Sequence, residues 1–489
     1  MIPEGKLFID GKWVEAENGD TYELTNPATG KTTVRVGRGS ENDVNKAVKA
    51  AKKALEGPWG KMSGTERGRL MLKLVELIDK HGEELARYNT EDMGKPISES
   101  RGESKGCTGN FIYYAGLGDK IEGFVHPVDS AFFNYTIREP VGVVGALTPW
   151  NFPSWMFSMK VAPPLGCGCT VVLKPAGISP RSSLLMGSLT KEAGFPDGVV
   201  NVVSGQGSKA GAALASHPDV HHVSLTGSSP VGKLVAQMAA SHLAGVTLEL
   251  GGKTPNIVFA DCPWDEAVNG SASSTFFNCG QVCVAASRLL VEEKIKDKFV
   301  AAIMEKAKKL RIGDPMKDET TLGPICSKDQ YATVTSYIEI GKKEGATVIM
   351  EGEKPKDPAL ANGFFVPPTI FDNVDNKMRI AQEEIFGPVL SVITFKDEED
   401  AIAKANDISF GLEALIWTND LRRAHRVASK VGAGIICVNC KGMVAPSVPY
   451  SGFKDSGLGY ESGLAAIESY TRRKNVWVRL SPEFSPYPE

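Results

Sequence analysis

The stretch Thr275-Phe-Phe-Asn-Cys-Gly-Gln-Val-Cys-Val-Ala-Ala-Ser-Arg288 contains a glycine and a glutamine, Gly280 and Gln281, just before the cysteine Cys283. These two residues interrupt an apolar run, so the backbone can turn there. A lone cysteine is usually a small buried hydrophobic residue. A thiol on a turn, however, can meet a reactant and use neighbouring backbone N–H groups. The setting of Cys283 therefore predicts a nucleophile.

Upstream of this stretch, continuous apolar segments alternate with segments of helical length. The expected strands are residues 141–147, 169–173, 199–203, 222–225 and 246–250. Strands without polar alternation are typical of a parallel sheet that helices cover on both faces. Such a sheet is suited to binding a dinucleotide at the carboxyl ends of its strands.

Downstream and on either side, the same pattern continues. Residues 256–439 predict a second α/β unit, with strands at 255–259, 288–291, 389–394 and 434–438 and helices at 294–310, 397–406 and 422–431. Near the N-terminus, residues 7–36 read as β-hairpins. Helices follow, over 42–55 with Ser40 or Asn42 as the cap and then from Ser63 to about residue 116. Aromatic and β-branched residues predict strands at 132–138 and 469–480.

Composition excludes several classes of protein. The chain has 489 residues and a net charge of −3, which predicts two to four domains and no nucleic-acid partner. We expect no membrane partner, since no run reaches the ~18 apolar residues of a span, and a cytoplasmic location. The nine cysteines are odd in number and widely spaced, against a disulfide framework. The pairs Cys167/Cys169 and Cys437/Cys440 lack a second pair at zinc-site spacing, so we expect no metal.

Five motifs together make the chain recognisable. They are Pro149-Trp-Asn-Phe-Pro153, Leu248-Glu-Leu-Gly-Gly-Lys253, Phe276-Phe-Asn-x-Gly-Gln-x-Cys283, Gln382-Glu-Glu-Ile-Phe-Gly-Pro388 and Pro449-x-x-Gly-Phe-Lys454. In this order the motifs resemble those of the NAD(P)-dependent aldehyde dehydrogenase superfamily, in its hydrolytic, non-acylating branch. The resemblance extends from Leu7 to about Val478.

The resemblance implies an α/β fold with two large domains and a small β oligomerisation arm. A Rossmann-type cofactor domain is expected over residues 1–122 and 141–251, and an α/β catalytic domain over 252–455. The arm and C-terminal segment would comprise residues 123–140 and 456–489, with the arm pairing with the C-terminal strand and a neighbouring subunit. A homo-oligomer is therefore implied, either a dimer or a tetramer.

The resemblance also implies the chemistry, in which an aldehyde is oxidised to a carboxylic acid through a thiohemiacetal and a thioester on Cys283. Glu249 would be the general base, because a carboxyl within an apolar strand is desolvated and its pKa rises. Asn151 would donate to the developing oxyanion; its local sequence alone favours an ordinary turn residue, and the set of motifs reverses that preference. Lys174 would contact the cofactor ribose. Cys279, one helical turn before Cys283, is the rival thiol.

For the cofactor, the turn Thr226-Gly-Ser-Ser-Pro-Val-Gly232 matters, because a strand precedes it and a helix from about Pro230 follows, with Ser229 as a possible cap. Such a helix start can hold a pyrophosphate, although many strand-to-helix turns carry Gly and Ser for steric reasons alone. The expected cofactor contacts are Thr148, Pro149, Trp150, Lys174, Gly177, Ser179, Arg181, Gly207, Gly211, Thr226, Gly227, Ser228, Leu250, Glu384 and Phe386.

Gly177 is a departure from the family pattern. Strictly NAD-using relatives tend to carry Glu there, whose carboxylate binds the ribose hydroxyls and repels a 2′-phosphate. Ser179 and Arg181 are close in sequence and could meet a phosphate, although Arg181 could equally be a solvated residue at a helix start. The sequence therefore predicts that NAD and NADP are both used, with NADP favoured.

The substrate pocket is inferred by matching positions to the family. Its expected lining is Phe152, Met156, Met159, Val282, Val284, Val444 and Tyr450. None of these residues is a fixed cation, so an apolar or aromatic aldehyde is expected rather than an anionic semialdehyde. Two other functions stay open from sequence: a CoA-acylating dehydrogenase, against which Glu249 argues, and a non-catalytic structural protein on the same fold.

Overall fold

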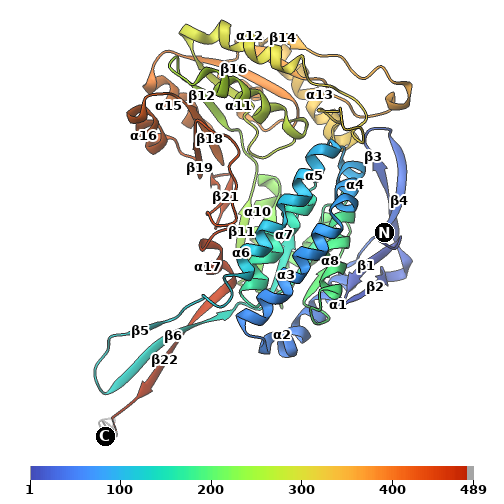
Figure 1. Cartoon of the computed structure of the whole chain (residues 1–489), viewed down its shortest axis with the longest axis vertical. Coiled ribbons are helices and arrows are strands. Elements are labelled where there is room, and N and C mark those ends of the chain that lie inside the picture. Colours follow the sequence, from blue (N-terminus) through green and yellow to red (C-terminus); the bar gives the residue numbers. More distant parts are fainter. Residues whose placement is uncertain (1, 482–489) are drawn as a thin grey trace.

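The computed structural model describes residues 2–481. Figure 1 shows two α/β regions, one above the other in that view, and a thin β-arm that extends away from the lower region towards the C-terminus. The predicted two-domain α/β architecture with an arm is thus the observed one.

The lower region is built on an eight-stranded sheet in the order β2-β1-β9-β8-β7-β10-β11-β21. Its strands are β1 (Lys6–Ile9), β2 (Lys12–Glu15), β7 (Val143–Leu147), β8 (Thr170–Lys174), β9 (Val200–Val202), β10 (His222–Thr226), β11 (Gly245–Glu249) and β21 (Gly457–Leu458). The five from β7 to β11 are parallel to one another. They match the five predicted strands, which differ by one or two residues at their ends.

Helices cover both faces of this sheet, and neighbouring residues of a strand therefore belong to two different hydrophobic cores. Val144 packs with helices on one face, whereas Val143 packs against those on the other. The first face carries α3 (Gly64–Lys80), α4 (Gly82–Met93), α5 (Ile97–Gly106), α6 (Thr108–Ala115), α7 (Pro153–Gly166) and α8 (Arg181–Glu192). The second face carries α1 (Glu41–Glu56), α9 (Ala212–Ala215) and α10 (Ser229–Ala240).

The helix starts show how local sequence fixes these elements. Ser40 caps α1 as predicted, since its side chain accepts from Asp43 N while Asp43 accepts from Ser40 N. A reciprocal pair of this kind satisfies two orphan donors at the helix start. At α10 the expected cap is wrong by one residue: Ser228 holds the cap position, and the Ser229 hydroxyl donates instead to Asp455 O at 2.8 Å.

The upper region is built on a seven-stranded sheet in the order β14-β15-β16-β13-β12-β18-β19. Its strands are β12 (Pro255–Val258), β13 (Arg288–Glu292), β14 (Thr347–Glu351), β15 (Thr369–Asp372), β16 (Val389–Phe395), β18 (Glu413–Trp417) and β19 (Ile435–Val438). Its longer helices are α11 (Trp264–Phe276), α12 (Lys296–Ala307), α13 (Lys328–Lys343), α15 (Glu398–Asn406) and α16 (Leu421–Lys430). The sequence did not indicate β14, β15 or β18.

The smaller elements join these regions. A hairpin of β3 (Thr21–Asn26) and β4 (Lys31–Gly37) follows the first one, as the sequence predicted. The remaining elements are α2 (Pro58–Lys61), α14 (Arg379–Gln382), β17 (Phe410–Gly411), β20 (Phe453–Lys454) and α17 (Ala465–Tyr470). None of the helices that the structure describes is both long and apolar enough to span a membrane.

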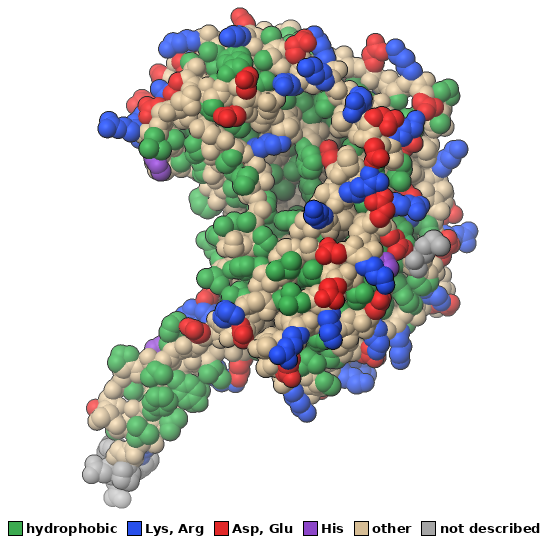
Figure 2. Space-filling view, in the orientation of Figure 1, with side chains coloured by type: hydrophobic (Ala, Val, Ile, Leu, Met, Phe, Trp, Pro, Cys, Tyr) green, Lys and Arg blue, Asp and Glu red, His purple; other side chains and the backbone are tan. Residues whose placement is uncertain are grey.

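The arm is a three-stranded antiparallel sheet in the order β22-β6-β5. Its strands are β5 (Phe124–His126), β6 (Phe132–Pro140) and β22 (Thr471–Arg479). Pairing of β6 with β22 runs from Pro140↔Thr471 to Phe132↔Arg479, which confirms the predicted partnership of these segments. Figure 2 shows hydrophobic side chains gathered along the arm, among them the exposed Phe124, Val125 and Trp477.

Candidate active site

The sheet of the lower region brings four of the predicted residues to one edge. Lys174 ends β8 opposite Leu147, the residue before Thr148, and Thr226 ends β10 opposite Glu249 at the end of β11. All of these are carboxyl ends of parallel strands, where open α/β sheets bind their ligands. The hydroxyls of Thr148 and Thr226 are buried without a hydrogen-bond partner in the described structure.

The helix that follows this edge has free donors. Gly227 N donates to Glu249 O at 3.0 Å, and no side chain caps the first N–H groups of α10. Uncapped N–H groups and the helix dipole suit an anionic pyrophosphate. Gly211 lies against Lys174, whose Cδ would be 3.4 Å from an added Cβ, whereas Gly207 is exposed with no atom close to it. Orphan hydroxyls, an uncapped helix and a lysine together fit a dinucleotide.

The turn before Cys283 adopts a conformation that few residues tolerate. Asn278, Cys279 and Gly280 all have positive φ, in the 3₁₀ turn Phe277–Gly280 that follows α11. An added Cβ on Gly280 would come to 2.1 Å from Gly387 O. The predicted turn at Gly280 is therefore confirmed, while the left-handed Asn278 and Cys279 carried no sequence signal. Strain of this kind persists only where the surroundings hold it.

Cys283 is half-buried, with its Sγ 3.7 Å from Tyr450 Oη. Burial raises the pKa of the Cys283 thiol to about 12, and the carboxyls of Glu384 and Glu249 act in the same direction. The thiol is therefore protonated at rest and needs a base. Cys279, in contrast, is 1% exposed in the core of the upper region and does not line the pocket around Cys283.

Glu249 is 3% exposed, and neither carboxyl oxygen has a hydrogen-bond partner in the described structure. Burial raises the pKa of Glu249 well above its usual range, and the nearby Glu461 adds to the rise. Glu461 itself accepts from Lys160 Nζ at 2.6 Å and from Ser224 Oγ at 2.7 Å. A buried carboxyl with free oxygens and a high pKa is suited to accepting a proton.

Asn151 is buried beside the turn that carries Cys283. Its Nδ2 donates to Gln281 O at 3.0 Å, and Asn278 Nδ2 donates to Asn151 O at 3.2 Å. Two hydrogen bonds thus join Asn151 to the turn before Cys283, although Asn151 and this turn are far apart in sequence. Bonds to two residues of the turn before Cys283 are more than a local turn residue needs.

Glu384 and Phe386 lie across from the sheet edge, on the segment after α14. Glu384 Oε1 accepts from Gly252 N at 3.1 Å, and burial raises the pKa of Glu384 to about 7. Phe386 has a φ of 58° and packs edge-on against Trp150, with ring centroids 5.3 Å apart. Burial lowers the pKa of Lys174 to about 8, and its Nζ donates to Pro175 O at 2.7 Å.

A cavity of about 700 Å³ opens beside Cys283, and all seven predicted pocket residues line it. Figure 2 shows a hollow between the two regions with hydrophobic side chains around it. The expectation of a lining without a cation is wrong, because Lys441 also lines this cavity, with the carboxyls Glu99, Glu103 and Glu413. All four charged residues lie outside the quoted motifs, so motif matching could not find them.

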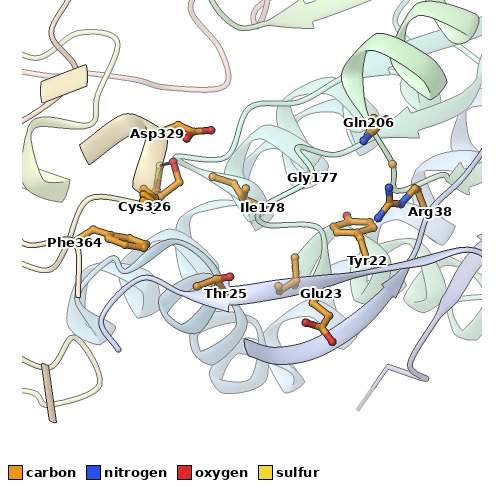
Figure 3. A pocket seen from close by; sticks show the side chains of 14 residues that line it. Tyr22, Glu23, Thr25, Arg38, Gly177, Ile178, Gln206, Cys326, Asp329 and Phe364 are labelled. Atoms are coloured by element: carbon orange, nitrogen blue, oxygen red, sulfur yellow. Dashed lines mark hydrogen bonds between the residues drawn. The ribbon is translucent and has the colours of Figure 1, made fainter. Parts of the chain in front are cut away.

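A second cavity, of about 400 Å³, adjoins Gly177 (Figure 3). Gly205 and Gln206 line it from the sheet side, and Tyr22 and Arg38 from the β3–β4 segment. Figure 3 shows Arg38 beside Tyr22 and Gln206. Arg38 donates to Thr21 O at 3.2 Å, and its Nε is 3.6 Å from Asp20 Oδ2. No sequence motif indicated Arg38, which is far from Gly177 along the chain.

Two predicted phosphate contacts are directed elsewhere. Arg181 is 6% exposed and forms ion pairs with Asp92 and Glu91, so it is neither solvated nor free to meet a phosphate. The reason is that α4 packs against α8 and brings these carboxylates to the start of α8. Ser179 is buried, and its hydroxyl donates to Trp150 O at 3.3 Å. In the part of the chain that the structure describes, no three His, Cys, Asp or Glu side chains form a metal-binding group.

Known proteins are similar to this chain in sequence and in structure over nearly its whole length. The model of the aldehyde dehydrogenase family matches residues 13–476. Aldehyde dehydrogenase 1A1 from Oryctolagus cuniculus is 45% identical over 484 residues, covering 98% of this chain and 97% of its own. Among solved structures, the NAD+ complex of an aldehyde dehydrogenase from Bacillus cereus has a TM-score of 0.95 and 44% identity, with 98% and 97% coverage. Betaine aldehyde dehydrogenase from Staphylococcus aureus with NAD+ has a TM-score of 0.96 and 37% identity, with 98% and 96% coverage.

Proposed function

Since the chain belongs to the aldehyde dehydrogenase family and so oxidises aldehydes to carboxylic acids with NAD(P), we propose that Cys283 is its nucleophile and Glu249 its general base. The observation that carries this assignment is the geometry around the cavity. The half-buried Cys283 thiol lines it, and Glu249 at the end of β11, whose two carboxyl oxygens lack partners in the described structure, acts electrostatically on that thiol.

In the first stage, Glu249 takes the thiol proton, directly or through water, and the Cys283 sulfur adds to the aldehyde carbon. The carbonyl oxygen becomes an oxyanion, for which Asn151 Nδ2 and the backbone N–H of Cys283 are the donors. Removing one such donor typically lowers the rate by roughly 10²–10³-fold. Asn151 is already tied to the turn, through its hydrogen bond to Gln281 O at 3.0 Å, so little reorganisation is needed.

Bound NAD(P) supplies the acceptor for the hydride that leaves the aldehyde carbon. On this chain, Glu384 and Lys174 would hold its ribose groups, Phe386 and Trp150 would pack beside it, and the start of α10 would bind its pyrophosphate. The buried hydroxyls of Thr148 and Thr226 lack partners in the described structure, which supports their use as cofactor contacts.

In the second stage, Glu249 has released the thiol proton to solvent, and water attacks the Cys283 thioester while Glu249 accepts a proton from that water. The C–S bond then breaks, the carboxylic acid leaves, and the thiol is restored. Sulfur is suited to both stages because it adds readily and leaves readily. The buried Glu249 supports hydrolysis over transfer to CoA, which needs no base for water.

Production of NAD(P)H on mixing the protein with an aldehyde tests this function. We expect turnover that does not depend on CoA and yields free acid. Turnover that requires CoA and yields an acyl-CoA would overturn the hydrolytic assignment, and absence of turnover with every aldehyde and both cofactors would overturn catalysis. Loss of NAD(P) binding in Cys283→Ala would show that the residue acts structurally.

For cofactor choice, we propose that NAD and NADP are both used, with NADP favoured. Gly177 leaves open space, since an added Cβ would meet only Gly205 O at 3.7 Å and Tyr22 Oη at 4.0 Å. A carboxylate in that space would repel a 2′-phosphate by roughly 1–4 kcal/mol. Arg38 lines the same cavity and replaces Arg181 as the source of attraction. Arg38 also forms a partly exposed ion pair with Asp20, with its Nε 3.6 Å from Asp20 Oδ2. This pair leaves other N–H groups of the guanidinium for a phosphate.

The ratio of kcat/KM for NADP to that for NAD tests cofactor choice. We expect Arg38→Ala to lower this ratio about tenfold, and Gly177→Glu to lower it further. Arg35→Ala is the matched control, because Arg35 is an exposed arginine on the same hairpin that pairs with Glu23 at 3.9 Å. A wild-type preference for NAD would refute the proposal that NADP is favoured. Equal NADP-to-NAD ratios of kcat/KM in Arg38→Ala and Arg35→Ala would refute the role of Arg38.

We also propose that the arm joins subunits in a homo-oligomer, a dimer or tetramer. The eight-, seven- and three-stranded sheets would then belong to cofactor, catalytic and oligomerisation domains, respectively. Exposed aromatic side chains on β5, β6 and β22 support the first point. A cytoplasmic location is proposed because every cysteine is in the described part of the chain and is free, as expected in a reducing compartment.

A further inference from the structure

Glu413 is a carboxyl in the substrate cavity that no step of the proposed reaction uses. It is the first residue of β18, a strand between β12 and β19 inside the upper sheet. The side chain is 3% exposed, yet it lines the same cavity as Cys283 and Tyr450. It acts electrostatically on the thiol, since it is one of the carboxyls that raise the pKa of Cys283.

The surroundings of Glu413 do not compensate its burial. Oε1 accepts a weak hydrogen bond from Cys437 Sγ at 3.3 Å, and no Lys, Arg or His forms an ion pair with it in the described structure. Burial raises the pKa of Glu413 to about 7, against the hydrogen bonds from Cys437 and from the backbone of Gly442. A buried carboxyl without a strong partner is costly unless a ligand completes its hydrogen bonds.

The rest of the cavity makes Glu413 an isolated polar point. Around it, Met156, Val284, Val444 and other apolar side chains provide most of the lining. Three other charged residues line the cavity. Glu103 forms an ion pair with Lys95, and the field of Glu99 opposes the fall that burial causes in the pKa of Lys441. Glu99 in addition accepts from Asn278 N at 3.0 Å and lies in the field of Lys95 and Lys441, whereas no opposite charge acts on Glu413 in the described structure.

We propose that Glu413 determines substrate specificity by hydrogen-bonding a neutral hydroxyl group of the aldehyde, at a position away from its carbonyl. This inference rests on the proposed function, in which the cavity holds the aldehyde. A neutral hydroxyl fits because it can donate to the ionised carboxyl and accept from the protonated one. A cation would meet Lys441 in the same cavity, and an anion would meet Glu413.

Matched aldehydes test this proposal. Ethylbenzaldehyde and hydroxymethylbenzaldehyde differ by a hydroxyl in place of a terminal methyl, and both meta and para isomers are compared. A site built to bind a hydroxyl rejects the analogue that lacks it, whereas an apolar site does not favour the hydroxyl. We expect wild-type kcat/KM to favour the hydroxymethyl compound in at least one isomer, and Glu413→Leu to lower that preference by tenfold or more.

Glu413→Gln separates this role from a structural one. Its amide keeps the size and can still bond a hydroxyl, so the preference should stay within about threefold of wild type. If Glu413→Leu does not fold, Glu413→Ala replaces it in the comparison. An unchanged preference in the Leu or Ala variant would overturn the proposal, as would an equal loss in Glu413→Gln. Faster oxidation of the cationic dimethylaminomethylbenzaldehyde than of the hydroxymethyl compound would overturn the choice of a neutral hydroxyl.

The two proposals fail differently in these assays. If the protein is not an aldehyde dehydrogenase of the proposed mechanism, the wild type oxidises neither member of the pair. If only the role of Glu413 is wrong, both compounds are oxidised and their kcat/KM ratio does not respond to substitution at this position.

Discussion

At the scale of single residues, the two neighbouring thiols differ in what they can reach. Cys283 lines the cavity, whereas Cys279 is packed in a core with Phe276. We expect Cys283→Ala to abolish NAD(P)H formation and Cys279→Ala to retain most of it, because only the first thiol can touch an aldehyde. Cofactor binding, measured by fluorescence, should persist in both variants. The reverse pattern of activity would exchange their roles.

The pKa of Glu249 makes a prediction about stability. In the unfolded chain this carboxyl ionises near its usual pKa of about 4.4, whereas in the folded protein burial keeps it protonated to a much higher pH. Between these two values the folded state binds more protons, so this group destabilises the fold progressively as pH rises.

Glu249→Gln removes that titration. We therefore expect the melting temperature of the variant minus that of wild type to increase as the pH is raised from about 5 to 8, by a few degrees. The same variant should hydrolyse the thioester slowly. A difference in melting temperature that is flat across this pH range would mean that the folded carboxyl is ionised throughout, and so that burial does not raise its pKa into this range.

Which residues the sequence could predict depends on how far apart their partners lie. Cys283 and Glu249 could be proposed from sequence because each lies within a short motif that carries its own setting. Arg181 was misassigned because its carboxylate partners are on α4, far from it in sequence. Arg38 and Glu413 were missed for the same reason, since only the folded chain brings them to Gly177 and Cys283.

At the scale of elements, the turn before Cys283, the proposed nucleophile, depends on one glycine. Gly280 has a φ of 69°, and an added Cβ would lie 2.1 Å from Gly387 O. We expect Gly280→Ala to lower kcat by 10²-fold or more, because a shift of about 1 Å in a reacting group is enough to do so. Gly82→Ala is the control, since nothing lies within 4 Å of its added Cβ. Near-normal activity in Gly280→Ala would show that the turn adjusts without moving Cys283.

Elements whose hydrophobic pattern matches their burial in the fold were predicted, and elements without such a match were not. The strands from β7 to β11 are buried on both faces and read as continuous apolar runs. β14 lies at an edge and is only partly buried, so its pattern is weak. β18 is fully buried but begins with Glu413. A carboxyl at the start of a strand interrupts the apolar run by which a buried strand is predicted. Positive φ at Asn278 and Cys279 depends on contacts that arise only after the two regions meet.

At the scale of the whole molecule, the arm should control assembly. Phe132 and Trp477 pack edge-on with ring centroids 5.9 Å apart, and both are exposed in the single chain. We expect Trp477→Asp to shift the mass in solution, measured by light scattering, towards smaller species, because a charge in an apolar interface is costly. Leu72→Asp, at an exposed leucine on α3, is the control. An unchanged mass in Trp477→Asp would remove the arm from the interface.

The short strand β21 has a consequence for how the chain is made. It covers the edge of β11 through Leu248↔Leu458 and Glu249↔Gly457, and Leu250 N donates to Ser456 O at 2.8 Å. During synthesis the first half of the protein therefore emerges from the ribosome with β11 uncovered, and an uncovered edge pairs readily with other chains. The strand that carries the proposed base is sealed only after almost the entire polypeptide has been translated, so nascent chains arrested before residue 457 should depend most on chaperones.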